Sequence, residues 1–122
     1  MKVGIEYHYA IFDMRVGEVP SAEEATKWLK RTCDHFGFGL DGISRKDFVA
    51  PVPGHAYTIV AVLSSSHAVI HTAPEEAWVE VAFACCKNID PNHLYEKVKE
   101  FFKPEDVRVT SFVGSVPRST LS

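Results

Sequence analysis

The chain has 122 residues, 46% of them hydrophobic, and its formal net charge is -3 at pH 7. This length and apolar content predict one compact domain with its own core, and the slight acidic excess argues against a nucleic-acid binder, which typically has a basic stripe. No apolar run approaches the roughly eighteen residues of a membrane helix. The three cysteines are odd in number and lack the spacing of a zinc site. We therefore expect a cytoplasmic protein with free thiols.

The first half of the chain predicts a strand, a helix and two further strands. Residues 3–12 alternate in the manner of a half-buried strand, with Tyr9 and Ile11 on its apolar face. Ser21 and Glu24 match a capping box, and apolar residues at helical spacing follow as far as the stop signal Gly37. An irregular strand over 38–48, a turn at 51–54 and a β-branched central strand at 57–63 come next.

The second half predicts two strands, a helix and a last strand. The strands cover 67–72 and 78–86, the helix begins at Asp90-Pro91 and ends at Lys103-Pro104, and a strand covers 107–113. Two helices cannot cover both faces of such a sheet. We therefore expect a single α+β domain over 1–122, a two-layer sandwich with both helices on one face of a mainly antiparallel sheet, in the order β-α-β-β/β-β-α-β. The other sheet face stays free for a site or a partner.

The chemically informative stretch covers residues 64–86. Strand alternation places His67 and His71 on the free face, and in the next strand it selects Cys86 rather than Cys85 for that face. A serine run supplies a hydroxyl nearby, so we expect Ser66, His71 and Cys86 to share the free face. Each also has an ordinary interpretation, as a solvated histidine, a turn serine or a small buried thiol. Periodicity alone does not decide between these interpretations.

The sequence from Ser66 to Glu75, SHAVIHTAPE, resembles the processing-site motif of the small prokaryotic S-adenosylmethionine decarboxylase proenzymes. That family typically has Glu-Ser-His, three residues, His-Thr-Trp-Pro-Glu, and later a cysteine followed by glycine. Aligned without gaps from the serine, the family cysteine falls on Cys86, which strand alternation selects independently. The family fold is an α+β sandwich that forms homodimers, in agreement with the expected architecture.

The resemblance implies a proenzyme that cleaves itself between Ser65 and Ser66 into a β chain of 1–65 and an α chain of 66–122. Ser66 would become a pyruvoyl group, a self-derived cofactor that holds the substrate amine as a Schiff base and replaces pyridoxal phosphate, with no obligatory metal. The implied activity is decarboxylation of S-adenosylmethionine for spermidine and other polyamine biosynthesis. No nucleic-acid or membrane partner is implied.

The same resemblance assigns roles to individual residues. His71 is the base for the elimination step, Cys86 is the acid that reprotonates the product, and Thr58 supports processing. The residues expected to bind substrate or support the site locally are Phe48, Glu75 and His67.

Four positions depart from the family pattern. Ser65 replaces glutamate, Ala73 replaces tryptophan, Lys87 replaces glycine, and Ile11 stands where an acidic residue is expected. The changes at Ala73 and Ile11 concern the substrate, so one alternative is a pyruvoyl-dependent decarboxylase of another amino acid. The change at Ser65 concerns processing, so another alternative is a non-processing, non-catalytic homologue that binds a ligand or a partner.

Overall fold

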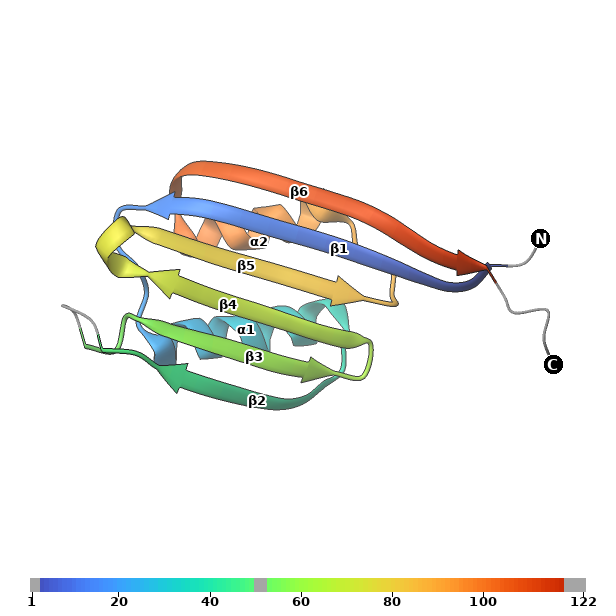
Figure 1. The fold of residues 1–122 in the computed structure, drawn as a ribbon, viewed down its shortest axis with the longest axis horizontal. Helices are drawn as coiled ribbons and strands as arrows, with labels where there is room; N and C mark the ends of the chain where they lie inside the picture. The colour runs from blue at the N-terminus through green and yellow to red at the C-terminus, as the bar shows by residue number, and fades with distance from the viewer. Residues whose placement is uncertain (1–2, 50–52, 118–122) are drawn as a thin grey trace.

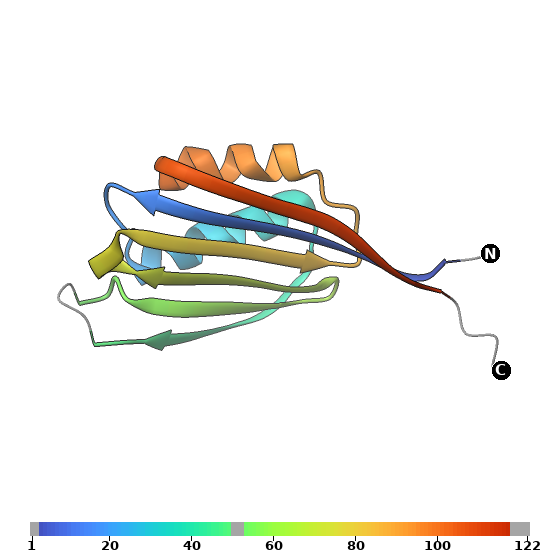
Figure 2. The same cartoon turned by 45° about the horizontal axis from the view of Figure 1, so that its top comes forward.

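A computed structural model of the chain describes residues 3–49 and 53–117. It contains a six-stranded antiparallel sheet of order β2-β3-β4-β5-β1-β6, with two helices against one face (Figures 1 and 2). In chain order the elements are β1 (Val3–Val16), α1 (Ala22–Phe36), β2 (Leu40–Asp47), β3 (Tyr57–Leu63), β4 (Ser66–Ala73), the 3-10 helix η1 (Pro74–Glu76), β5 (Trp78–Cys85), α2 (Pro91–Phe102) and β6 (Pro104–Pro117). The predicted fold class and element order are confirmed. The turn expected at 51–54 lies partly outside the described residues.

The buried face of β1 is the opposite of the one expected from the sequence. Ala10, Phe12 and Met14 are at most 1% exposed beneath the helices, whereas Tyr9 and Ile11 lie partly exposed on the free face. The strand continues to residue 16, beyond the predicted end at residue 12. Both faces of β1 are largely apolar, and two of the four buried apolar residues, Met14 and Val16, lie in this extension, so alternation over residues 3–12 did not identify the buried face.

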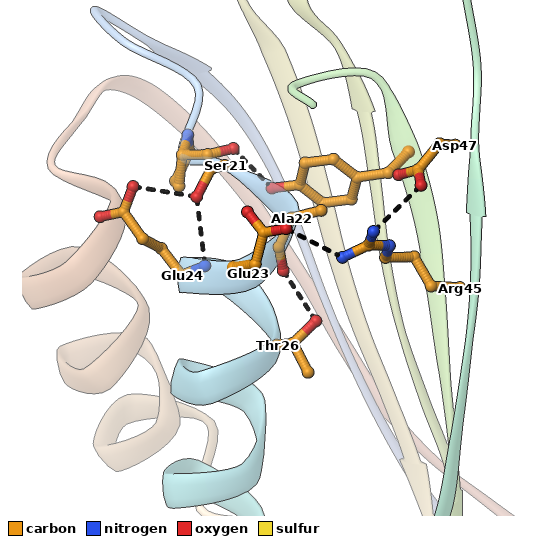
Figure 3. A network of polar contacts seen from close by, with 9 residues as sticks. Ser21, Ala22, Glu23, Glu24, Thr26, Arg45 and Asp47 are labelled. Carbon is orange, nitrogen blue, oxygen red and sulfur yellow. Dashed lines mark hydrogen bonds and ion pairs between the residues drawn. The ribbon is translucent and has the colours of Figure 1, made fainter. Parts of the chain in front are cut away.

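The start of α1 is fixed by a local cap. The hydroxyl of Ser21 accepts the Glu24 N–H at 3.2 Å and donates to the Glu24 carboxylate at 3.1 Å (Figure 3). Arg45 of β2 forms an ion pair with Glu23 of the helix at 3.7 Å and another with Asp47 of its own strand at 3.1 Å (Figure 3). Exposed ion pairs of this kind contribute at most about 1 kcal/mol each. The cap, rather than the ion pairs, therefore determines where the helix begins.

The second helix also begins where the sequence predicts. The Asp90 carboxylate accepts the N–H of Asn92 at 3.0 Å and so caps α2. The two helices run antiparallel side by side (Figure 1), and the ring of Trp28 stacks on Phe101 at a centroid distance of 5.4 Å and meets Phe102 edge-on at 5.1 Å. These contacts bury the apolar faces of both helices against each other and the sheet. Over residues 3–49 and 53–117, no helix has the length and apolar character needed to cross a membrane.

The loop after α1 lies directly against the β3–β4 turn. Gly37 ends the helix in the left-handed conformation, at φ 66, and Gly39 has φ 73. The Gly39 carbonyl accepts the Ser64 N–H at 2.7 Å, and a Cβ on Gly39 would lie 1.8 Å from the Ser64 Oγ. Glycine is therefore required at position 39 both for its backbone conformation and for the approach of the turn.

We expect Gly39→Ala to lower the free energy of unfolding by roughly 2 kcal/mol, because alanine is strained at positive φ and its Cβ would collide with the turn. Urea unfolding followed by circular dichroism measures this change. Gly42→Ala is the matched control, since no atom lies within 4 Å of a Cβ built there. Equal losses in the two variants would contradict the assignment of the turn contact.

Candidate active site

The turn between β3 and β4 holds the peptide between Ser65 and Ser66 at one end of the sheet. Ser65 is buried, and its hydroxyl donates to the Phe38 carbonyl at 2.8 Å. The Ser65 carbonyl accepts the backbone N–H of Cys86 at 2.8 Å. The carbonyl immediately before Ser66 is thus fixed in place and polarised by a hydrogen-bond donor.

Ser66 itself has an uncommon backbone conformation. Its φ is 149, a value that residues with a side chain rarely adopt and that costs about 1–3 kcal/mol. The Ser66 hydroxyl lies 3.0 Å from Nδ1 of His67. A hydroxyl beside a strained peptide with a polarised carbonyl is suited to an intramolecular shift of the acyl group from nitrogen to oxygen.

A second group of side chains surrounds His71 on the free face. Thr58 Oγ1 lies 2.6 Å from His71 Nδ1, and these two residues are direct partners in the β3–β4 register. The Trp78 ring meets the imidazole edge-on at a centroid distance of 5.4 Å, and the Phe48 ring lies 6.4 Å away at 85°. The structure therefore brings three sequence-predicted residues together, namely Thr58, His71 and Phe48, and adds Trp78.

Two carboxylates that the sequence analysis did not assign to the site extend this group across the sheet. Glu80 pairs with His71 on one side and with Asp13 on the other, and Asp13 pairs with Arg108. Burial raises the pKa of the Glu80 carboxyl, and the charge and hydrogen bond of Asp13 raise it further, while His71 opposes the shift. Alternation along 78–86 puts Glu80 on the same face as Cys86, whereas Asp13 lies beyond the predicted end of its strand at residue 12.

The cysteines differ in their environment, as strand alternation predicted for the last two. Burial raises the pKa of the Cys33 thiol to about 11. Burial also raises the pKa of the Cys85 thiol, while the hydrogen bond from Ser65 lowers it by less. Both buried thiols therefore stay protonated at neutral pH, and the exposed thiol is that of Cys86, just after β5.

Within one chain, Ser66 does not approach His71. The two residues are five positions apart on β4, which corresponds to roughly 16 Å of extended strand. The Ser66 hydroxyl lies 3.0 Å from Nδ1 of His67, which is exposed on the free face, so this hydroxyl is at one end of that face and His71 is near the other. The structure therefore does not bring Ser66 and His71 together within a single chain, although both are expected on the free face.

A cavity of about 600 Å³ opens at the end of the free face nearest to Trp78. Ala73 lines it, in place of the family tryptophan, and its short side chain leaves this space open. Glu75 is exposed on the neighbouring helix η1. The charged residues that line the cavity are Asp13, Arg15, Glu76, Asp106 and Arg108.

Comparison with known proteins gives a consistent result. Residues 6–113 match the family described as S-adenosylmethionine decarboxylase. The S-adenosylmethionine decarboxylase proenzyme 2 of Bacillus cereus is 24% identical over 89 residues, which cover 72% of this chain and 69% of that protein. The S-adenosylmethionine decarboxylase proenzyme of Methanococcus maripaludis is 40% identical over 53 residues, 43% of each chain.

A solved structure has the same fold. The crystal structure of the adenosylmethionine decarboxylase from Aquifex aeolicus superposes with a TM-score of 0.69 at 20% sequence identity, covering 100% of this chain and 98% of the other. Since the family match extends over nearly the whole described chain, from β1 to β6, this protein belongs to the S-adenosylmethionine decarboxylase family.

Proposed function

We propose that this chain is a proenzyme that cleaves itself before Ser66 and becomes a pyruvoyl-dependent decarboxylase of S-adenosylmethionine. The observation that carries the proposal is the contact between the Ser65 carbonyl and the Cys86 N–H, at a strained residue that supplies a hydroxyl. Family membership supports the same activity. The contact matters because it stands where negative charge would develop during cleavage.

The first step is attack of the Ser66 hydroxyl oxygen on the Ser65 carbonyl carbon. The Cys86 N–H stabilises the oxyanion, and His67, 3.0 Å from the hydroxyl, accepts its proton. The carbon–nitrogen bond then breaks, the proton passes to the departing amine, and an ester joins Ser65 to the Ser66 side chain. Release of backbone strain at Ser66 favours this direction.

The second step is elimination, with His71 as the base that removes the Ser66 α-hydrogen. The bond between Cβ and the ester oxygen breaks, which frees the Ser65 carboxylate and leaves dehydroalanine at position 66. Addition of water and loss of ammonia yield the pyruvoyl group, whose ketone withdraws electrons from a bound amino acid during decarboxylation. The Cys86 thiol then donates a proton to the substrate carbon that has lost carbon dioxide.

Two copies of the chain are needed to complete such a site. Ser66 begins β4 and His71 lies near its other end, so a two-fold axis across the free face can place His71 of one copy beside Ser66 of the other. Exposed apolar side chains on that face suit burial in a homodimer: Val60 is 37% exposed, Val62 55% and Phe112 50%. We therefore propose a homodimer with its active sites at the interface.

Ser66→Ala should abolish cleavage, because it removes the attacking hydroxyl. Mass spectrometry of the denatured wild-type protein should show fragments 1–65 and 66–122, the second with pyruvoyl in place of serine, whereas Ser66→Ala should give one species near 13.6 kDa. Ser64→Ala, in the same turn, is the matched control and should still be cut. A wild-type chain that stays whole after long incubation would instead support the non-catalytic homologue.

Cys86→Ala should permit cleavage but reduce decarboxylation by about 10²–10⁴-fold, because the backbone N–H remains while the proton donor is lost. The measurement is release of carbon dioxide from carboxyl-labelled S-adenosylmethionine by the cleaved variant. Cys85→Ala alters a buried thiol that faces the helices and serves as the control, with turnover near wild type. The reverse order of the two effects would disprove the assignment of the acid.

Co-expression tests whether the site spans two copies. His71→Ala alone and Ser66→Ala alone should each remain uncut. When they are co-expressed, the His71→Ala chain should be cut, since its intact Ser66 can meet the intact His71 of a Ser66→Ala partner. Mass spectrometry distinguishes the two chains. Absence of this fragment in co-purified mixed dimers would show that the base comes from the same chain.

A second substrate class is favoured by one observation. The cavity beside Trp78 is open at Ala73 and carries both arginines and carboxylates, which suits a smaller amino acid with charge at both ends. The alternative is therefore decarboxylation of a basic amino acid by the same pyruvoyl chemistry. Parallel assays with S-adenosylmethionine and basic amino acids distinguish the two substrate classes, because only the true substrate should release carbon dioxide.

A further inference from the structure

Two histidines, one on each helix, lie next to each other on the helix side of the sheet, and neither belongs to the candidate active site. His35 lies in the last turn of α1, and His93 lies in the first turn of α2. Their Nε2 atoms are 3.4 Å apart, the ring centroids are 5.3 Å apart, and the ring planes are nearly perpendicular at 85°. Both residues are exposed, so ions in solution can reach the pair.

We propose that His35 and His93 form an open binding site for a divalent transition-metal ion such as Zn²⁺. Two imidazole nitrogens that are each about 2.05 Å from a tetrahedral zinc ion lie about 3.4 Å apart, with ring centroids about 5.2 Å apart. The observed separations, 3.4 Å and 5.3 Å, match both values. The separation of the two nitrogens is thus the one that a shared zinc ion would require.

In the absence of an ion the two rings are within hydrogen-bonding distance of each other, but this bond is long. A separation of 3.4 Å is long for a hydrogen bond between nitrogens, and a straight bond of that length would place the centroids about 5.7 Å apart. The shorter observed centroid distance means that at least one of the two rings is tilted away from the line between the nitrogens.

The surrounding structure holds the rings in place before any ion binds. The Phe36 ring meets each imidazole edge-on, with both centroid distances at 4.9 Å. The ends of the two helices are fixed by Gly37 and by the Asp90 cap. The two ligands are 58 positions apart in the chain, so the unfolded chain lacks the site, and binding should stabilise the folded state.

The donor set limits which ion binds and how tightly. Imidazole suits zinc, copper, nickel and cobalt, whereas magnesium and calcium prefer oxygen ligands. The described residues contain no group of three or more histidine, cysteine or acidic side chains around a metal position, so water would fill the remaining coordination sites. Arg31 and Lys97 line the groove beside His35, together with Glu100. With two ligands and nearby cations, we expect micromolar rather than nanomolar affinity.

Such an ion would tie together the two loops that hold the processing turn. The loop after α1 supplies Phe38 and Gly39 to Ser64 and Ser65, and the segment before α2 contains Cys86 and Lys87. Lys87 already joins the two segments by donating to the Gly37 carbonyl at 2.6 Å. The proposed metal site therefore has a structural role, in holding these two segments together on the helix side of the sheet. It does not depend on the proposed enzymatic activity.

The test is titration of the full-length protein with zinc chloride, followed by isothermal calorimetry and by imidazole ¹⁵N NMR. We expect one Zn²⁺ per chain at this site, joint shifts of the His35 and His93 resonances, and at least a tenfold loss of affinity in His35→Gln or His93→Gln. His55→Gln, a histidine bound to the Val19 carbonyl, is the matched control and should keep wild-type affinity. Magnesium chloride should shift neither resonance.

Two results would overturn the proposal. One is a zinc affinity that both glutamine variants retain. The other is the absence of His35 and His93 shifts in the wild-type protein at about millimolar zinc, including the case in which other histidines or Cys86 respond instead. The NMR measurement uses the unmodified chain, so it remains decisive even if a variant proves unstable.

Discussion

Ser66 and His71 lie on one extended strand that is hydrogen-bonded on both sides, and this pairing keeps the two residues apart. Strand β4 cannot bend back between Ser66 and His71, because β3 and β5 both pair with it over this whole stretch. The two ends of the strand therefore carry different functional groups. One end has a hydroxyl, a polarised carbonyl and the Cys86 thiol, and the other has an imidazole with hydroxyl and carboxylate neighbours. A base at the second end acts on the first only across an interface between two copies, which is why the proposed mechanism requires a dimer.

The processing turn is held mainly by backbone groups. The Ser65 carbonyl is bound by the N–H of Cys86, and the Phe38 carbonyl accepts from both the N–H and the hydroxyl of Ser65. Any residue except proline at position 86 offers the same N–H. Replacement of the family glutamate by serine at position 65 therefore leaves the contact to the reacting carbonyl intact. The small serine side chain is satisfied beneath the turn, in a buried position where a carboxylate would be costly without a partner.

Local signals in the sequence were sufficient for the helices and for most strands. The caps at Ser21 and Asp90 and the stop at Gly37 are where the structure has them, because capping depends on residues within a few positions of each other. The contact of Cys86 with Ser65 and that of Asp13 with Glu80 depend on the register between distant segments, which alternation does not determine. The error on β1 has a different cause: both faces of this central strand are largely apolar, so the identity of the buried face depends on which side the helices occupy.

The departures from the family pattern are unevenly distributed over the sheet. Ala73 and Ile11 lie on the free-face side of the molecule, where Ala73 opens the cavity and Ile11 pairs with Ala82 in an apolar row next to that of His71. A carboxylate is still present on β1 two positions further on, at Asp13, where it faces Glu80 rather than an apolar neighbour. The contacts of the Ser65 carbonyl lie at the opposite end of β4 and involve none of these residues. In the proposed mechanism, changes at Ala73 and Ile11 therefore leave the contacts of the acyl shift untouched, whereas the elimination step shares His71 with the cavity end of the sheet.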